Sequence, residues 1–273
     1  MPRKLPFDLA ALRGIARELR DSDADERPLV VVGARELAPV LARELGKGAS
    51  PGALREGGAI EHPLALLYVL AGEPNADDLR ELRSAVRTRT PLVCVCIGAG
   101  GVPLPQVPAT NTVRVPSGQG FPIEEIGRTL ARCLAGASPA LAARVPALRA
   151  AICDELIRQS SRRGGYFGAA TFVPGPDLPR LFLEQARLVL RLAAAHGRKL
   201  EPLRAAELAA VLAAGLGLRK LVRGSRAATA IPAWALQGSI AYAGTRAIGE
   251  GALRYFEISN ESNRPLAAKR SLS

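Results

Sequence analysis

Hydrophobic and polar positions in the first half of the chain alternate between short apolar runs and stretches of helical spacing. The apolar runs are bounded by glycine, proline or charged residues and predict strands at residues 29–33, 64–71, 91–97 and 112–115. The stretches of helical spacing predict helices at residues 8–20, 35–46, 76–88 and 122–134. Continuous apolar strands that alternate with helices are typical of parallel sheets. We therefore expect an α/β fold, with a small, mostly parallel sheet and helices on both faces.

The second half of the chain has helical patterns only. A helical stretch at 139–162 contains Pro146, which predicts a kink or a boundary there. A loop rich in glycine and proline is expected at 164–179, and further helices at 180–196, 201–222 and 231–256. This pattern predicts three parts: an α/β domain at 1–136, an all-α helical domain at 137–258 and a disordered basic tail at 259–273.

Charge is distributed unevenly between the two halves. The net charge is +12, and residues 136–273 carry 20 basic and 9 acidic residues, which places +11 in that half. Such asymmetry predicts an anionic partner, namely a membrane surface, a nucleic acid or an acidic protein, or else a solvated basic face. Four basic residues between two apolar segments are the expected contacts with an anionic surface: Arg219, Lys220, Arg223 and Arg226.

The four cysteines predict neither a disulfide framework nor a metal site. Cys94 and Cys96 share one face of a strand, but the chain has no second closely spaced cysteine pair, and His62 and His196 are isolated. We expect buried, reduced thiols, no metal and a cytoplasmic location. The amphipathic N-terminus does not have the pattern of a signal peptide.

A glycine turn follows the first predicted strand, where a phosphate-binding loop begins in many nucleotide hydrolases. After Gly33 the sequence has Ala38, Pro39 and Val40 at the positions of the glycine, lysine and hydroxyl residue of a GxxxxGK[ST] loop. Pro39 has no ammonium group and Val40 has no metal-binding oxygen. The sequence therefore predicts a degenerate Walker A motif.

These first-half elements together resemble a degenerate GTPase domain of the Era/TrmE-like class. The segment 113–121, followed by a helix, is similar to the last guanine-contact loop of that family, but Gly98 to Gly101 stand where the NKxD motif would lie, and no DxxG motif is present. The resemblance implies a vestigial nucleotide site formed by Gly33, Ala34, Arg35, Ser117 and Gly118. Because the lysine, the hydroxyl residue and the aspartates of phosphoryl transfer are missing, we expect no enzyme activity and no cofactor.

The second half resembles the GTPase-associated helical domain of the YcjF type. The residues that carry this resemblance lie at 172–179, 184–197 and 231–257. Members of this family occur behind GTPase domains or in bacterial inner-membrane proteins. The resemblance therefore implies a partner GTPase or a homo-oligomer, and a location peripheral to the inner membrane or inserted in it.

A stripe of small residues runs along the helix predicted at 231–256. Its members recur at every fourth position and are expected to pack against another helix: Ala235, Ser239, Ala243, Ala247 and Gly251. Residues 227–245 carry no formal charge, which leaves two interpretations open. One is a helical hairpin that dips into a bilayer, and the other is a buried hairpin within a helical domain.

The sequence therefore predicts a non-catalytic pseudo-GTPase or adaptor that docks to a partner protein or to an anionic membrane through its basic helical domain. A GTPase-like enzyme that binds nucleotide through atypical motifs is the first alternative. A nucleic-acid-binding module is the second alternative, disfavoured because aromatic residues for stacking on bases are few.

Overall fold

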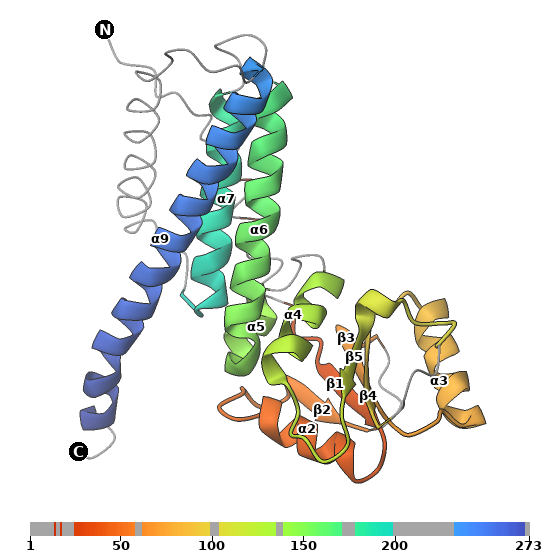
Figure 1. Ribbon diagram of the computed structural model, residues 1–273. Helices are drawn as coiled ribbons and strands as arrows, with labels where there is room; N and C mark the ends of the chain where they lie inside the picture. The colour runs from red at the N-terminus through yellow and green to blue at the C-terminus, as the bar shows by residue number, and fades with distance from the viewer. Residues whose placement is uncertain are drawn as a thin grey trace, which may run out of the picture. The chain divides into compact units, whose positions relative to one another are not determined.

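The computed structural model describes residues 14, 17, 25–57, 62–98, 104–134, 139–170, 178–198 and 232–270 (Figure 1). The chain forms two compact units, which are described separately. The α/β unit comprises Ser22–Glu155, and the helical unit contains the described residues from Leu156 onward. The helices predicted at 8–20 and 201–222 lie outside the described residues, apart from positions 14 and 17.

The α/β unit contains a five-stranded, all-parallel sheet with the order β2-β1-β3-β4-β5. The strands are β1 (Leu29–Gly33), β2 (Leu54–Glu56), β3 (Ala65–Ala71), β4 (Leu92–Ile97) and β5 (Thr112–Val115). The predicted fold class is confirmed. The sequence missed β2, because Leu-Arg-Glu has no apolar run, and the strand exists through its parallel pairing of Leu29 with Leu54.

Helices cover both faces of the sheet. Helix α3 (Ala76–Arg87) lies on one side, while α2 (Leu37–Leu45) and α4 (Ile123–Cys133) lie on the other (Figure 1). A buried cluster fills the space beneath α3 and contains Tyr68, Leu70, Leu82, Ala85, Leu92, Cys94, Cys96 and Val107. A short 3-10 helix, η1 (Ala109–Asn111), leads into β5. The fold thus places the carboxyl ends of all five strands along one edge.

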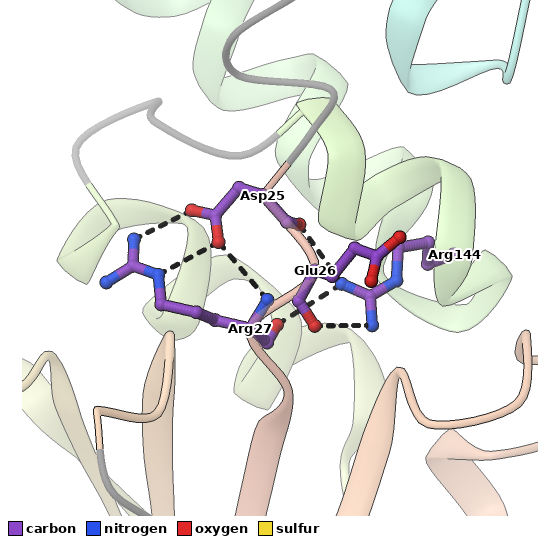
Figure 2. A network of polar contacts seen from close by, with 4 residues as sticks. All are labelled: Asp25, Glu26, Arg27 and Arg144. Carbon is purple, nitrogen blue, oxygen red and sulfur yellow. Dashed lines mark hydrogen bonds and ion pairs between the residues drawn. The ribbon is translucent and has the colours of Figure 1, made fainter.

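The α/β unit extends beyond the boundary that the sequence placed at residue 136. Helix α5 (Pro139–Arg144) ends in an arginine whose guanidinium donates hydrogen bonds to four main-chain carbonyls, those of Asp25, Glu26, Arg27 and Gly52, at 3.0–3.3 Å. Figure 2 shows this arginine beside the chain that leads into β1. The amide of Ser50 in turn donates to the carbonyl of Arg144 at 2.8 Å. Helix α5 and the first turns of α6 (Pro146–Ala170) therefore belong with the sheet.

The helical unit is built from the later part of α6, α7 (Leu178–Ala195) and α9 (Ala233–Arg270). Pro146 begins α6, which confirms the predicted boundary, but α6 continues to Ala170 through glycines that predicted a loop. A Cβ at Gly164 would lie 2.6 Å from Thr245 Oγ1, and a Cβ at Gly168 would lie 2.5 Å from Ala241 Cβ. These glycines let α6 and α9 approach closely, so their contact with α9 offsets the low helix propensity of glycine.

The contact face of α9 is not the stripe that the sequence predicted. Ser239, Ala243, Ala247 and Gly251 are exposed and Ala235 is half-buried. The buried residues form the neighbouring rows of the helix: Gly238, Ala241, Gly244, Thr245, Ile248, Gly249, Ala252 and Phe256. The true face includes Thr245 and Phe256, so counting small residues at every fourth position selected the wrong side of the helix.

Helix α9 also continues past the predicted start of a disordered tail. Its backbone is helical to Arg270, whereas the sequence predicts disorder from residue 259. The polar residues at 259–264 have ordinary helix propensities, and the helical backbone continues through Pro265. Polarity alone therefore did not mark a helix end.

Candidate functional site

The site that the fold favours for a ligand lies at the carboxyl edge of the sheet. In open parallel sheets ligands bind outside the carboxyl ends of the strands, where the strand order reverses. Here that point lies between β1 and β3, because the chain leaves β1 for β2 on one side and returns to β3 on the other. The predicted phosphate-binding residues Gly33, Ala34 and Arg35 lie at this point.

The first residues of the turn after β1 are held against β3. Gly33 has φ +113°, and a Cβ on it would lie 2.1 Å from the carbonyl oxygen of Val69. The amide of Ala34 donates to the same oxygen at 2.8 Å. The backbone of β1 therefore stays bonded to β3 past the end of the strand, and the Ala34 amide is not available to an anion.

Few main-chain donors remain in the first turn of α2. Residues 34–36 alone connect β1 to α2. The amides of Leu37 and Ala38 both donate to the carbonyl of Ala34, at 3.1 and 2.9 Å, and Pro39 has no amide proton. Phosphate loops bind anions through a series of backbone amides that point at the ligand. This turn is too short to supply such a series, and the amides of Ala34, Leu37 and Ala38 are already bonded within the chain.

Carboxylates occupy the neighbouring helix N-terminus. Asn75 caps α3 by accepting hydrogen bonds from the amides of Asp77 and Asp78 at 2.8 and 2.9 Å, and Asp78 completes a capping box. The other oxygen of Asp78 accepts a hydrogen bond from Tyr68 Oη at 2.8 Å. Burial, with help from Asp78 and Glu81, raises the pKa of Tyr68 well above its usual value. The amides of Asp77 and Asp78 are therefore already bonded to Asn75, and the carboxylates of the same turn repel a phosphate.

The other predicted nucleotide contacts lie at the far end of the same edge. Ser117 and Gly118 are exposed and follow β5, so β3 and β4 lie between them and Gly33. A Cβ at Gly98, which directly follows β4, would lie 2.5 Å from Ser117 Oγ. Ser117 is thus packed against the turn after β4, and the structure places it two strands away from the first predicted group.

A pair of thiols on β4 is a second cluster of chemically reactive groups. Cys94 and Cys96 project from the same face of β4, as the sequence predicts, and their sulfur atoms lie 3.6 Å apart. A hydrogen bond from the Cys94 thiol lowers the pKa of Cys96, with the cation of Arg114 acting in the same direction against burial. The same hydrogen bond and burial raise the pKa of Cys94. Spacing predicted the shared face, but the nearby arginine follows only from the pairing of β4 with β5.

One end of the helical unit carries exposed aromatic side chains. Tyr166 and Phe167 on α6 are 78% and 36% exposed, and Trp234 on α9 is 53% exposed. The last turns of α6 lie against the first turns of α9, since a Cβ at Gly168 would lie 2.8 Å from the carbonyl oxygen of Gln237. The same end of both helices is seen in Figure 1. The three aromatic residues therefore gather at one end, in a chain with only 4% aromatic residues.

Two arginines accompany this aromatic end. Arg162 and Arg163 are exposed and lie one helical turn before Tyr166 and Phe167. Residues four apart lie side by side on a helix surface, so each arginine neighbours an aromatic residue. Sequence reasoning missed this group because it assigned 164–179 to a loop. The predicted basic contacts Arg219, Lys220, Arg223 and Arg226 lie outside the described residues.

Within the described ranges, no three or more histidine, cysteine, aspartate or glutamate side chains form a group that could hold a metal ion. Among the helices of those ranges, none combines the length and the apolar character that a bilayer crossing requires. Comparison of the chain with models of protein families, with curated proteins and with solved structures gave no match. The resemblances to a GTPase domain and to a YcjF-type domain therefore remain predictions from the sequence.

Proposed function

We propose that this protein is a non-catalytic docking protein, whose α/β unit holds no nucleotide and whose helical unit binds an anionic lipid surface. The observation that carries the first part is the bond from the Ala34 amide to the Val69 carbonyl, which closes the turn after β1. Phosphoryl transfer depends on cations and donors that surround the phosphates. The N-terminus of α3, which follows the neighbouring strand β3, presents Asp77 and Asp78 instead.

The aromatic end of the helical unit supports the second part. Tryptophan and tyrosine are favoured at the boundary between lipid and water, where the ring enters the interface and the polar group stays hydrated. Arginine side chains reach from such a boundary to the headgroups. Tyr166, Phe167, Trp234, Arg162 and Arg163 provide both kinds of group at one end of α6 and α9.

The charge of this part of the chain fits the same partner. The chain from residue 156 onward carries 18 basic and 7 acidic residues, a net charge of +11. Each basic residue near an anionic leaflet contributes about 1 kcal/mol to binding. A peripheral contact of this kind requires no membrane-spanning helix.

Sedimentation of the full chain with lipid vesicles tests this function. We expect binding to vesicles of phosphatidylcholine with phosphatidylglycerol, weak binding to phosphatidylcholine alone, and loss of binding at high salt. Arg162→Gln and Arg163→Gln should each weaken binding about fivefold, as the loss of roughly 1 kcal/mol implies. Trp234→Ser should weaken binding without changing its salt dependence.

Arg254→Gln is the matched control, because Arg254 is exposed on α9 of the same unit but lies far along the helix from Trp234. Equal loss of binding for Arg254→Gln and Arg162→Gln would show that net charge, and not the aromatic end, binds the lipid. Equal binding to neutral and anionic vesicles would overturn the proposal. So would a preference for RNA or DNA over vesicles in a competition assay.

A further inference from the structure

We propose that Cys94 and Cys96 form a reversible intrachain disulfide when the protein meets a peroxide, with Arg114 as the positioning residue that favours Cys96 as the attacking thiol. This inference is independent of the proposed docking function. It rests on three features: the distance between the two sulfurs, the unequal environments of the two cysteines, and the arginine on the neighbouring strand.

The geometry of β4 brings the two thiols close together. The two sulfurs lie 3.6 Å apart on the same face of one strand. Two residues along a strand separate their Cα atoms by about 6.6 Å, near the upper limit of the roughly 4.4–6.8 Å range of disulfides. The Cβ atoms must also approach to about 3.8 Å, so β4 must bend locally when the bond forms. Closing the bond requires the sulfurs to approach to about 2 Å, and a bond made near the limit of this range is strained and easily reduced. These features fit a reversible bond better than a structural one.

The two cysteines differ in what surrounds them. Cys94 is fully buried and lies between Tyr68 on β3 and Thr112 on β5, whereas Cys96 is 7% exposed and lies next to the end of β4. Cys96 is paired in register with Arg114 of β5, and paired residues of parallel strands project from the same face. Arg114 is exposed, so a cation lies beside Cys96 on the same face of the sheet.

The titratable and charged groups around the pair favour ionisation at Cys96. Arg114 on β5 stabilises a thiolate there, while Asp78 on α3 acts on Cys94 and disfavours its ionisation. Tyr68 on β3 stays protonated, since burial and Asp78 raise its pKa. The thiolate is the reactive form of cysteine, so the direction of these effects assigns the first step to Cys96.

The chemistry balances with hydrogen peroxide as the oxidant. The Cys96 thiolate attacks one peroxide oxygen, the O–O bond breaks, and the products are a sulfenic acid on Cys96 and, after one protonation, water. The Cys94 sulfur then attacks the Cys96 sulfur and expels the hydroxyl group, which leaves as a second water with the proton of the Cys94 thiol. Both cysteines together lose two electrons, which the peroxide accepts.

Mass spectrometry of the full, folded chain tests the bond directly. After treatment with hydrogen peroxide and alkylation, tryptic digestion yields the peptide of residues 90–114, which contains Cys94 and Cys96 and neither of the other cysteines. We expect this peptide to lose two hydrogens and both alkylation sites, and to regain them after dithiothreitol. Alkylation of both cysteines after peroxide, or oxidation of Cys96 only to sulfinic acid, would overturn the proposal.

Two cysteine variants assign the order of the steps. Cys94→Ser should leave a sulfenic acid on Cys96 that dimedone traps, and Cys96→Ser should leave Cys94 unoxidised. Cys133→Ser is the control and should not change the product in the 90–114 peptide. Trapping of the sulfenic acid on Cys94 would reverse the assignment and so contradict the role of Arg114.

Arg114→Gln tests the positioning role. It should slow alkylation of Cys96 several-fold near neutral pH, with the difference vanishing at a pH where both thiols are ionised, and Arg114→Lys should restore part of the rate. Arg83→Gln, which removes an exposed arginine from α3, is the matched control. A loss of rate that is independent of pH would mean that Arg114 only supports the fold, which overturns this part of the proposal.

Discussion

The Cα atom of Gly33 lies so close to the main chain of Val69 that a Cβ at position 33 would be 2.1 Å from the Val69 carbonyl oxygen and 2.8 Å from its nitrogen. This contact places the end of β1 directly against β3. The glycine that suggested a nucleotide loop from the sequence is therefore explained by the packing of two strands. A need for glycine arises here from the close approach of a neighbouring backbone and the positive φ angle, without any ligand.

Gly33→Ala should consequently destabilise the protein by about 3 kcal/mol, because the strands must separate and because φ +113° is strained for alanine. Urea unfolding followed by circular dichroism measures the change. Gly52→Ala is the matched control, since φ there is +75° but a Cβ would meet no atom within 4 Å. That variant should lose only about 1 kcal/mol from backbone strain. Equal losses in the two variants would show that the contact with Val69 contributes nothing.

The closed turn after β1 also predicts that nucleotides leave the stability of the protein unchanged. A ligand that binds only the folded state at one hundred times its dissociation constant stabilises that state by about 2.7 kcal/mol. Magnesium with GTP or GDP at millimolar concentration should therefore not shift the thermal midpoint, as a site of micromolar affinity would. Differential scanning fluorimetry provides the measurement, and isothermal titration provides an independent check. A clear upward shift would contradict the proposal that the α/β unit holds no nucleotide.

Much of the α/β unit was predictable because local sequence determines it. The predicted strands at 29–33 and 112–115 agree with β1 and β5 residue by residue, since continuous apolar runs between turn residues are found in buried parallel strands. Asn75 stands directly before the predicted helix 76–88 and caps α3, and capping is a local interaction. The short strand β2 was not predictable, since its three residues form a strand only through pairing with β1.

The errors in the helical unit share one cause, which is tertiary contact. Gly164 and Gly168 predicted a loop by propensity, but both lie within α6 where α9 approaches. The predicted stripe at Ser239, Ala243 and Gly251 has the right spacing for a close helix contact yet is exposed. A helix has several faces with the same period, and the sequence of one helix does not say which face its neighbours cover. The candidate contacts at Tyr166 and Phe167 were missed for the same reason.

The contact of α6 with α9 predicts opposite effects for two glycine substitutions. Gly168→Ala should destabilise the protein by about 2 kcal/mol, because the new Cβ would meet Ala241 Cβ at 2.5 Å. Gly251→Ala should stabilise it by up to about 1 kcal/mol, because this site is an exposed helix interior with no atom within 4 Å of a Cβ. Chemical denaturation of both variants measures the effects. Stabilisation by Gly168→Ala would mean that α6 and α9 do not approach as described.

The hydrogen bonds of Arg144 join α5 to the chain that leads into the sheet, and we expect them to stabilise the α/β unit. Arg144→Met removes hydrogen bonds from one guanidinium to four carbonyls, those of Asp25, Glu26, Arg27 and Gly52, and should destabilise the α/β unit by about 2 kcal/mol. Hydrogen exchange should then become faster in the chain before β1 and in the turn at Gly52. Arg128→Met is the control, since Arg128 makes an exposed ion pair with Glu124 and should cost less than about 1 kcal/mol. Similar losses in both variants would contradict the structural role of Arg144.

The ion pair between Asp25 and Arg27 leads us to expect a loss of folding stability in acid. Its carboxylate accepts hydrogen bonds from the Arg27 guanidinium at 2.7 and 2.8 Å, and this contact is the main cause that lowers the pKa of Asp25 below its usual value. A carboxyl group whose pKa is lower in the folded state stabilises the fold above the unfolded pKa, near 3.9, and loses that contribution as the pH falls through the folded pKa. The pair is partly exposed, so the contribution should be about 0.5 kcal/mol. Asp25→Asn should therefore destabilise the protein by that amount at pH 7 and by less at pH 3, as urea unfolding at both pH values would show. The same loss at both pH values would mean that the side chain acts through its shape alone and that the ion pair contributes nothing.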